Sequence, residues 1–189
     1  MNHTLTANEI QGRAIGAIFF AAFGTLWVAL ALYALECLRP ASLAWLGMIL
    51  IVLLVMARWV HRQGKRLPSV TDDPTLARTF NRVNIIQWIA VGITAFTFAR
   101  LHLDAYILSA ITAIVGLHFF PLARLFRYRP HYFTGGLLCA WAAASALFLP
   151  LDRIQGLTAM GTGILLLASS YLTLNLAAAK LRRSHPLPC

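Results

Sequence analysis

Charged residues are scarce in this sequence. Only 12% of its 189 residues are charged and only six are acidic, whereas an average soluble protein carries roughly a quarter charged residues. So little charge cannot cover a water-exposed surface. Hydrophobic residues make up 59% of the chain and are gathered in long runs, which indicates a polytopic membrane protein.

Groups that common membrane and hydrolytic chemistries require are missing as well. No acid lies within an expected span, which disfavours carboxylate-based proton or sodium coupling. The three cysteines have no C-x-x-C spacing, so no disulfide framework or zinc site follows. His61, His102 and His131 lie at expected helix ends, so none is expected to pair with His118 as a haem ligand. We therefore expect no catalytic residue, no metal and no cofactor, and an enzymatic function is disfavoured.

Six apolar runs have about the length that crosses a bilayer, which takes roughly 20 helical residues for a hydrocarbon core of about 30 Å. They predict an all-α fold, with one domain over 1–189 and transmembrane helices at 14–35, 41–60, 83–99, 105–125, 132–149 and 154–176. The first run is too long for a cleavable signal. Gly64 is placed to end the second helix, while Asp73 and Pro74 are placed to begin a helical extension that leads into the third.

Basic residues are distributed unevenly between the two sides of such a bundle. Of the 16 lysines and arginines, only Arg39, Arg100 and Arg153 fall on one side, and the other 13 share the side of both termini. Because basic loops are retained in the cytoplasm, both termini are expected to be cytoplasmic. The basic face would bind anionic headgroups of membrane lipids, and no nucleic acid is expected as a partner. The expected headgroup contacts are Arg62, Lys65, Arg66, Arg124, Arg127 and Arg129.

A histidine and a proline interrupt the fourth run within residues 116–123, which we call the histidine–proline segment. Pro121 cannot donate a hydrogen bond to the carbonyl of Leu117, and its ring presses against that carbonyl, so the sequence predicts a helix kink at Pro121. His118 lies beside the expected kink. An ionisable residue inside the membrane often marks a functional site, whereas a buried histidine can also fix helix packing through a partner such as Gln87. Both interpretations remain open.

Polar side chains of two other helices are expected at the depth of His118. Because helices 83–99 and 105–125 form an antiparallel hairpin, counting equally from their loop places Gln87 opposite His118, with Asn84 on the same face. The inner half of helix 154–176 adds hydroxyls and amides. We therefore predict an inward-opening polar cavity around His118 that binds or transports a small solute or a lipid. Its ligand-binding residues would be His118, Gln87, Asn84, Tyr171, Ser170 and Asn175.

Small residues on helix 132–149 favour an alternative. Gly136, Ala140 and Ala144 fall on one face, and such faces let membrane helices approach closely. This helix is therefore expected to be the central packing helix. Together with the lack of intramembrane acids, the small face favours a non-catalytic membrane subunit or a homo-oligomeric structural protein.

Residues 116–123, Gly-Leu-His-Phe-Phe-Pro-Leu-Ala, with 132–135 a few residues on, resemble the signature of an uncharacterised family of small bacterial multi-helix inner-membrane proteins. The resemblance covers only the region around the fourth helix. It implies a location in the bacterial cytoplasmic (inner) membrane and no catalytic activity. In length and number of spans the chain also resembles the substrate-binding subunits of energy-coupling vitamin transporters, with no shared motif.

Overall fold

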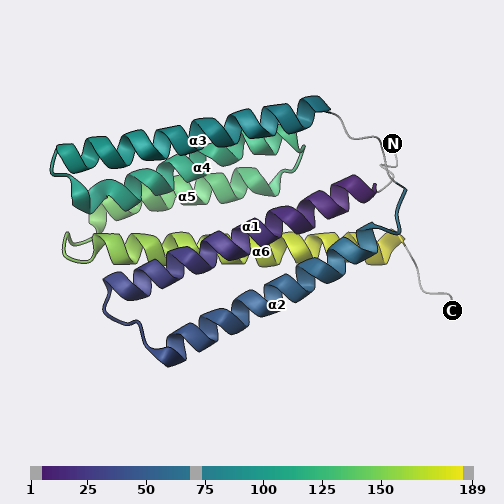
Figure 1. Ribbon diagram of the computed structural model, residues 1–189, viewed down its shortest axis with the longest axis horizontal. Coiled ribbons are helices and arrows are strands. Elements are labelled where there is room, and N and C mark those ends of the chain that lie inside the picture. Colours follow the sequence, from purple (N-terminus) through teal and green to yellow (C-terminus); the bar gives the residue numbers. More distant parts are fainter. Residues whose placement is uncertain (1–5, 69–73, 185–189) are drawn as a thin grey trace.

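The computed structural model describes residues 6–68 and 74–184, and this part of the chain is folded into helices without a strand. Six α-helices run along one long axis and alternate in direction (Figure 1). They are α1 (Ala7–Ala34), α2 (Pro40–Gly64), α3 (Pro74–Arg100), α4 (Ile107–Leu125), α5 (Pro130–Phe148) and α6 (Ile154–Ser184), with a short 3-10 helix, η1 (Asp104–Tyr106), before α4. We call the end of the bundle that holds the start of α1 and the end of α6 the terminal end, and the opposite end the hairpin end.

Five of the six described helices are long and apolar enough to cross a membrane: α1, α2, α3, α6, and α4 together with η1. In α5 the first turn contains Pro130, His131 and Tyr132, and glycines and alanines replace many of the larger apolar residues. Large apolar side chains such as Trp45 and Phe133 are exposed on the outside of the bundle. A surface of this kind suits hydrocarbon better than water.

α1 and α6 form the most extensive helix pair of the bundle, and α2 packs beside them. The buried face of α1 consists largely of alanines, including Ala14, Ala17 and Ala21. Where α1 crosses α6, a Cβ added to Gly163 would lie 2.8 Å from the carbonyl oxygen of Gly24. The two backbones therefore touch, which gives van der Waals packing that larger residues would prevent.

α4 packs against α5 in a similar way. A Cβ added to Gly135 would lie 2.7 Å from the carbonyl oxygen of Gly116. The small face expected on this helix is not the one used, because Gly136 and Ala140 are exposed. The helix is apolar on all sides, so its sequence pattern does not distinguish the packed face from the exposed one.

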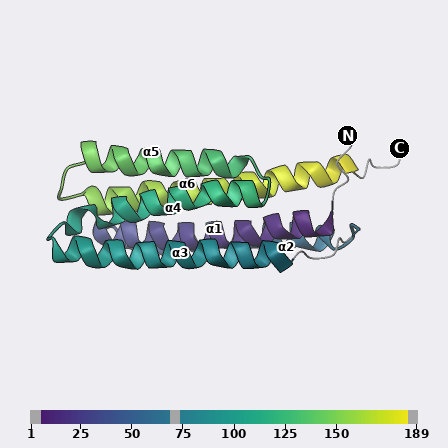
Figure 2. The ribbon, with the colours of Figure 1, turned by 90° about the horizontal axis from the view of Figure 1, so that it is seen from above.

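α3 is the least buried helix. It packs mainly against α4, and none of residues 75–100 is buried. Figure 2 shows α1 and α3 on one side of the bundle and α5 on the other, with α4 and α6 between them. α3 is thus held chiefly from one side.

Helix ends extend beyond several of the apolar runs. α1 begins at Ala7 instead of residue 14, and Thr6 caps it by accepting a hydrogen bond from the Glu9 backbone N–H at 3.3 Å. α6 continues to Ser184 instead of ending near 176. α2 ends at Gly64 and α3 begins at Pro74, the two residues that the sequence indicated, whereas the expected cap Asp73 lies outside the described residues.

Candidate functional site

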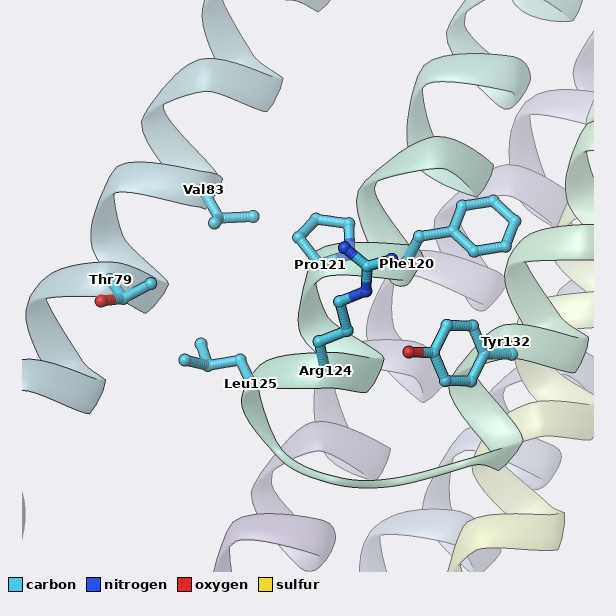
Figure 3. A pocket seen from close by; sticks show the side chains of 7 residues that line it. All are labelled: Thr79, Val83, Phe120, Pro121, Arg124, Leu125 and Tyr132. Carbon is cyan, nitrogen blue, oxygen red and sulfur yellow. The ribbon is translucent and has the colours of Figure 1, made fainter.

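A groove opens in the terminal half of the bundle between α3, α4 and α5 (Figure 3). Its volume is about 630 Å³, which falls within the range of roughly 300–1,000 Å³ that small-molecule pockets occupy. We call it the α3–α5 groove. It is lined by Thr79 and Val83 of α3, by Phe120, Pro121, Arg124 and Leu125 of α4, and by Tyr132 of α5.

One wall of the groove is formed by the last turns of α4 and the first turn of α5. The rings of Phe120 and Tyr132 lie 6.1 Å apart between centroids. Pro121 does not end α4, which continues as one helix to Leu125. The ring of Pro121 lines the groove, and its nitrogen has no N–H to give to the preceding turn.

The other wall is formed by α3. Thr79 and Val83 are four residues apart and therefore lie on one face of the helix. The hydroxyl of Thr79 donates to the carbonyl of Thr75 at 2.9 Å. Since α3 is held chiefly by α4, this wall has the weakest support from neighbouring helices.

Arg124 and Tyr132 bring polar groups into this otherwise mainly apolar groove. Figure 3 shows the Arg124 side chain extending beside Pro121, with the hydroxyl of Tyr132 turned toward α4. Within residues 6–68 and 74–184, Arg124 forms no ion pair. Among the described residues, the groove thus combines a guanidinium that has no ion-pair partner with mainly apolar walls.

His118 does not line the groove. It is half-buried, and its ring lies 6.1 Å from the ring of Phe119. Asn84 and Gln87 are half-buried on α3, and no hydrogen bond joins either of them to His118 in the described structure. The predicted pairing of Gln87 with His118 is therefore not formed.

α6 packs against α1, α2, α4 and α5, and in the described part of the chain no hydrogen bond joins its predicted site residues to His118. Ser170 is fully buried and donates to the carbonyl of Ala17 at 2.8 Å. Tyr171 is 56% exposed, and Asn175 donates to the carbonyl of Tyr171 at 2.9 Å. These α6 side chains bond to carbonyls of α1 and of α6 itself, and the one polar layer expected of α3, α4 and α6 stays a prediction.

His131 lies in the first turn of α5, at the helix end where the sequence predicts it, and it also belongs to a cluster of rings. Its ring is 4.8 Å from that of Tyr128, 5.6 Å from that of Phe119 and 5.7 Å from that of Phe20. Arg13 stacks over Tyr128 at 4.7 Å from the ring centroid. The available signal was Pro130, which favours the first helical position and so places His131 inside the first turn of α5.

An ion-pair network joins the two ends of the chain. Glu9 of α1 accepts hydrogen bonds from Arg13 of the same helix and from Lys180 of α6, the latter at 2.9 Å. Glu9 is therefore used to neutralise cations of α1 and α6 and not those around the groove.

Polar side chains do meet at the hairpin end, between α4, α5 and α6. Ser109 lies 3.0 Å from Ser145 and 3.3 Å from Thr158, and Thr112 lies 2.9 Å from Thr162, measured between hydroxyl oxygens. All five residues are buried. We call this group the hydroxyl cluster; it joins helices and fills the interior.

Six basic residues expected to contact lipid headgroups are all exposed and lie toward the terminal end. Only Arg124 among them lines the α3–α5 groove. The six are Arg62, Lys65, Arg66, Arg124, Arg127 and Arg129.

No protein-family model, curated protein or solved structure matches this chain. The resemblance of residues 116–123 to a family of bacterial membrane proteins stays a prediction.

Proposed function

We propose that this is an integral protein of the bacterial inner membrane that binds a lipid or a small amphipathic solute in the α3–α5 groove. The observation that carries the proposal is the combination of Arg124 and Tyr132 with the apolar walls formed by Val83, Phe120 and Leu125. A few placed polar groups in a mainly apolar concave surface are typical of ligand sites. In this proposal the ligand-binding role belongs to Arg124, which lies nearer the end of α4 than His118, and to Tyr132 of α5.

The proposal includes six spans with both termini in the cytoplasm. The uneven distribution of basic residues favours this topology. α5 has 19 residues, which at 1.5 Å per residue is about 28 Å and close to the thickness of the hydrocarbon core. Six alternating helices also account for the start of α1 and the end of α6 at one end of the bundle (Figure 1).

The groove is placed to receive a molecule from the membrane. α3 has no buried residue between 75 and 100, so its outer faces would contact lipid. The described hydroxyl cluster fills the space between α4, α5 and α6 at the hairpin end, with Thr158 and Thr162 fully buried. We therefore propose binding in the cytoplasmic half and no transport path through these three helices.

A tryptophan substitution on α3 tests the proposal. Val83→Trp would fill the groove, whereas Ile85→Trp adds the same side chain at a position of α3 that is 58% exposed and does not line the groove. Each purified protein would be analysed for bound lipid by native mass spectrometry in mild detergent. We expect bound lipid to be lost in Val83→Trp and retained in Ile85→Trp. Equal retention in both variants would contradict the proposal.

A homo-oligomer is a second candidate, favoured by the exposed small residues of α5. Gly136 and Ala140 are exposed, and a Cβ added to Gly136 would meet nothing within 4 Å. Two copies of this face could approach closely. Light scattering in detergent tests the idea, because an oligomer that Ala140→Trp converts to monomers would support it, and a monomeric parent protein would exclude it.

A further inference from the structure

The polar side chains of the α3–α5 groove differ in whether their hydrogen-bond donors already bond within the protein. Thr79 gives its hydroxyl hydrogen to the Thr75 carbonyl, so it has none to give to a ligand. Arg124 and Tyr132 form no hydrogen bond through their side chains in the part of the chain described here. Figure 3 shows both side chains bordering the same space. They are therefore the donors that a ligand in the groove would meet.

No described acid is placed to neutralise Arg124. Glu9 pairs with Arg13 and Lys180 at the terminal end. The other described acids lie in connections at the hairpin end and are Glu36, Asp104 and Asp152. A guanidinium held beside apolar surface is stabilised by an anion, and its planar fork matches carboxylate or phosphate oxygens.

The apolar side chains of the groove favour a ligand that has an apolar part as well as a negative charge. A free inorganic anion lacks such a part. The side chains concerned are Val83, Phe120 and Leu125. Their side chains form apolar walls beside Arg124. Contact with this surface would not stabilise a bound inorganic phosphate, because the ion has no apolar surface to bury. A lipid would place its acyl chain against these walls and so bury apolar surface that water would otherwise reach. Anionic lipids are also the molecules that a basic cytoplasmic face concentrates.

We propose that the α3–α5 groove binds the phosphate group of an anionic phospholipid, with Arg124 as the principal donor and Tyr132 as the second. This inference rests on the proposed function and adds the chemical class of the ligand. The acyl chain would extend from Arg124 past Val83 of α3, and the headgroup would face the cytoplasmic interface.

Lipid titrations of the full-length protein in detergent test this assignment. Kd would be measured by native mass spectrometry for phosphatidylglycerol, which carries an anionic phosphate, and for diacylglycerol, which has the same acyl chains and no phosphate. We expect Arg124→Gln to raise Kd for phosphatidylglycerol about 10- to 100-fold, because a hydrogen bond to a charged group is lost. Arg124→Lys should raise Kd less than Arg124→Gln does, since the positive charge remains. The matched control is Arg58→Gln, which removes the same charge from an exposed position of α2.

Each outcome decides the assignment. A preference for phosphatidylglycerol that Arg124→Gln removes and Arg58→Gln leaves intact supports it, provided that circular dichroism shows both variants folded. Equal losses in the two variants overturn it, and so does displacement of the lipid by millimolar glycerol phosphate. Binding of both lipids without preference, still blocked by Val83→Trp, overturns the headgroup assignment and leaves the proposed function standing. Lipid binding that Val83→Trp does not reduce overturns both.

Discussion

Glu9 and Arg124 carry opposite charges and differ in whether they have an ion-pair partner. Glu9 is bound by Arg13 and Lys180, whereas Arg124 has no ion pair in the described structure. The sequence predicted on which side the cations gather, because that depends only on the order of loops and spans. It could not predict which cations are neutralised, because Lys180 reaches Glu9 only once α1 and α6 pack together.

Replacing Glu9 by glutamine should lower stability modestly. The substitution leaves Arg13 and Lys180 without their carboxylate partner. Because both ion pairs are partly exposed, we expect a loss of only about 1 kcal/mol in the free energy of unfolding. Denaturant unfolding in detergent micelles, followed by circular dichroism, would measure it. Asp152→Asn is the control, because its pair with Arg153 is 3.5 Å long and largely exposed. A Glu9→Gln effect no larger than that of the control would contradict this role.

His118→Leu should change stability little. In the described structure the His118 side chain makes no hydrogen bond, and its ring contact with Phe119 can be replaced by an apolar side chain. We expect a change below about 1 kcal/mol in the free energy of unfolding, since no partner is left unsatisfied. A loss of about 1–3 kcal/mol in the same unfolding assay would instead indicate a hydrogen bond to Gln87 or to the Leu117 carbonyl.

At the scale of helices, the apolar runs predicted the six elements but only some of their ends. A run marks the part of a helix that crosses hydrocarbon, because that part must be apolar. Outside it the helix can continue in polar sequence, as α1 does from Ala7, where Thr6 supplies the cap, and as α6 does to Ser184. The contact faces were not predictable from composition, since Gly135 and Gly136 are identical residues with opposite environments.

These two neighbouring glycines give a matched test of the α4–α5 contact. Gly135→Ala places a Cβ 2.7 Å from the carbonyl oxygen of Gly116, so the helices must separate, and we expect a loss of about 1–3 kcal/mol. Gly136→Ala meets nothing within 4 Å and should be neutral, or stabilising by up to about 1 kcal/mol through helix propensity. Thermal unfolding of both variants in one detergent would compare them. Equal melting temperatures would show that α4 and α5 do not touch at Gly135.

At the scale of the whole molecule, the site depends on which helices are neighbours. Counting from the loop between α3 and α4 gives the depth of Gln87 and His118 but not the position of α6, which packs against α1. The predicted layer of Asn84, Gln87, His118 and Tyr171 rests on depth alone and therefore stays a prediction. The groove was not predicted as such, although Pro121 and Arg124 had been singled out for the kink and for headgroup contact.

Topology is tested by reporters fused after Cys189. With six spans and both termini inside, green fluorescent protein should fluoresce there and alkaline phosphatase should be inactive, because the former folds in the cytoplasm and the latter requires disulfides of the periplasm. The opposite result would place the C-terminus in the periplasm and contradict this topology, as either five spans or six spans in the reverse orientation would require.

The central claim is that the α3–α5 groove holds a lipid, and a cryo-electron microscopy map of the protein in nanodiscs containing phosphatidylglycerol tests it most directly. The account predicts continuous lipid density between α3 and α4, with a phosphate oxygen about 2.7–2.9 Å from the Arg124 guanidinium and an acyl chain against Val83. A map in which the groove is closed by its own side chains, with Arg124 extended into solvent and no lipid beside it, would contradict the account.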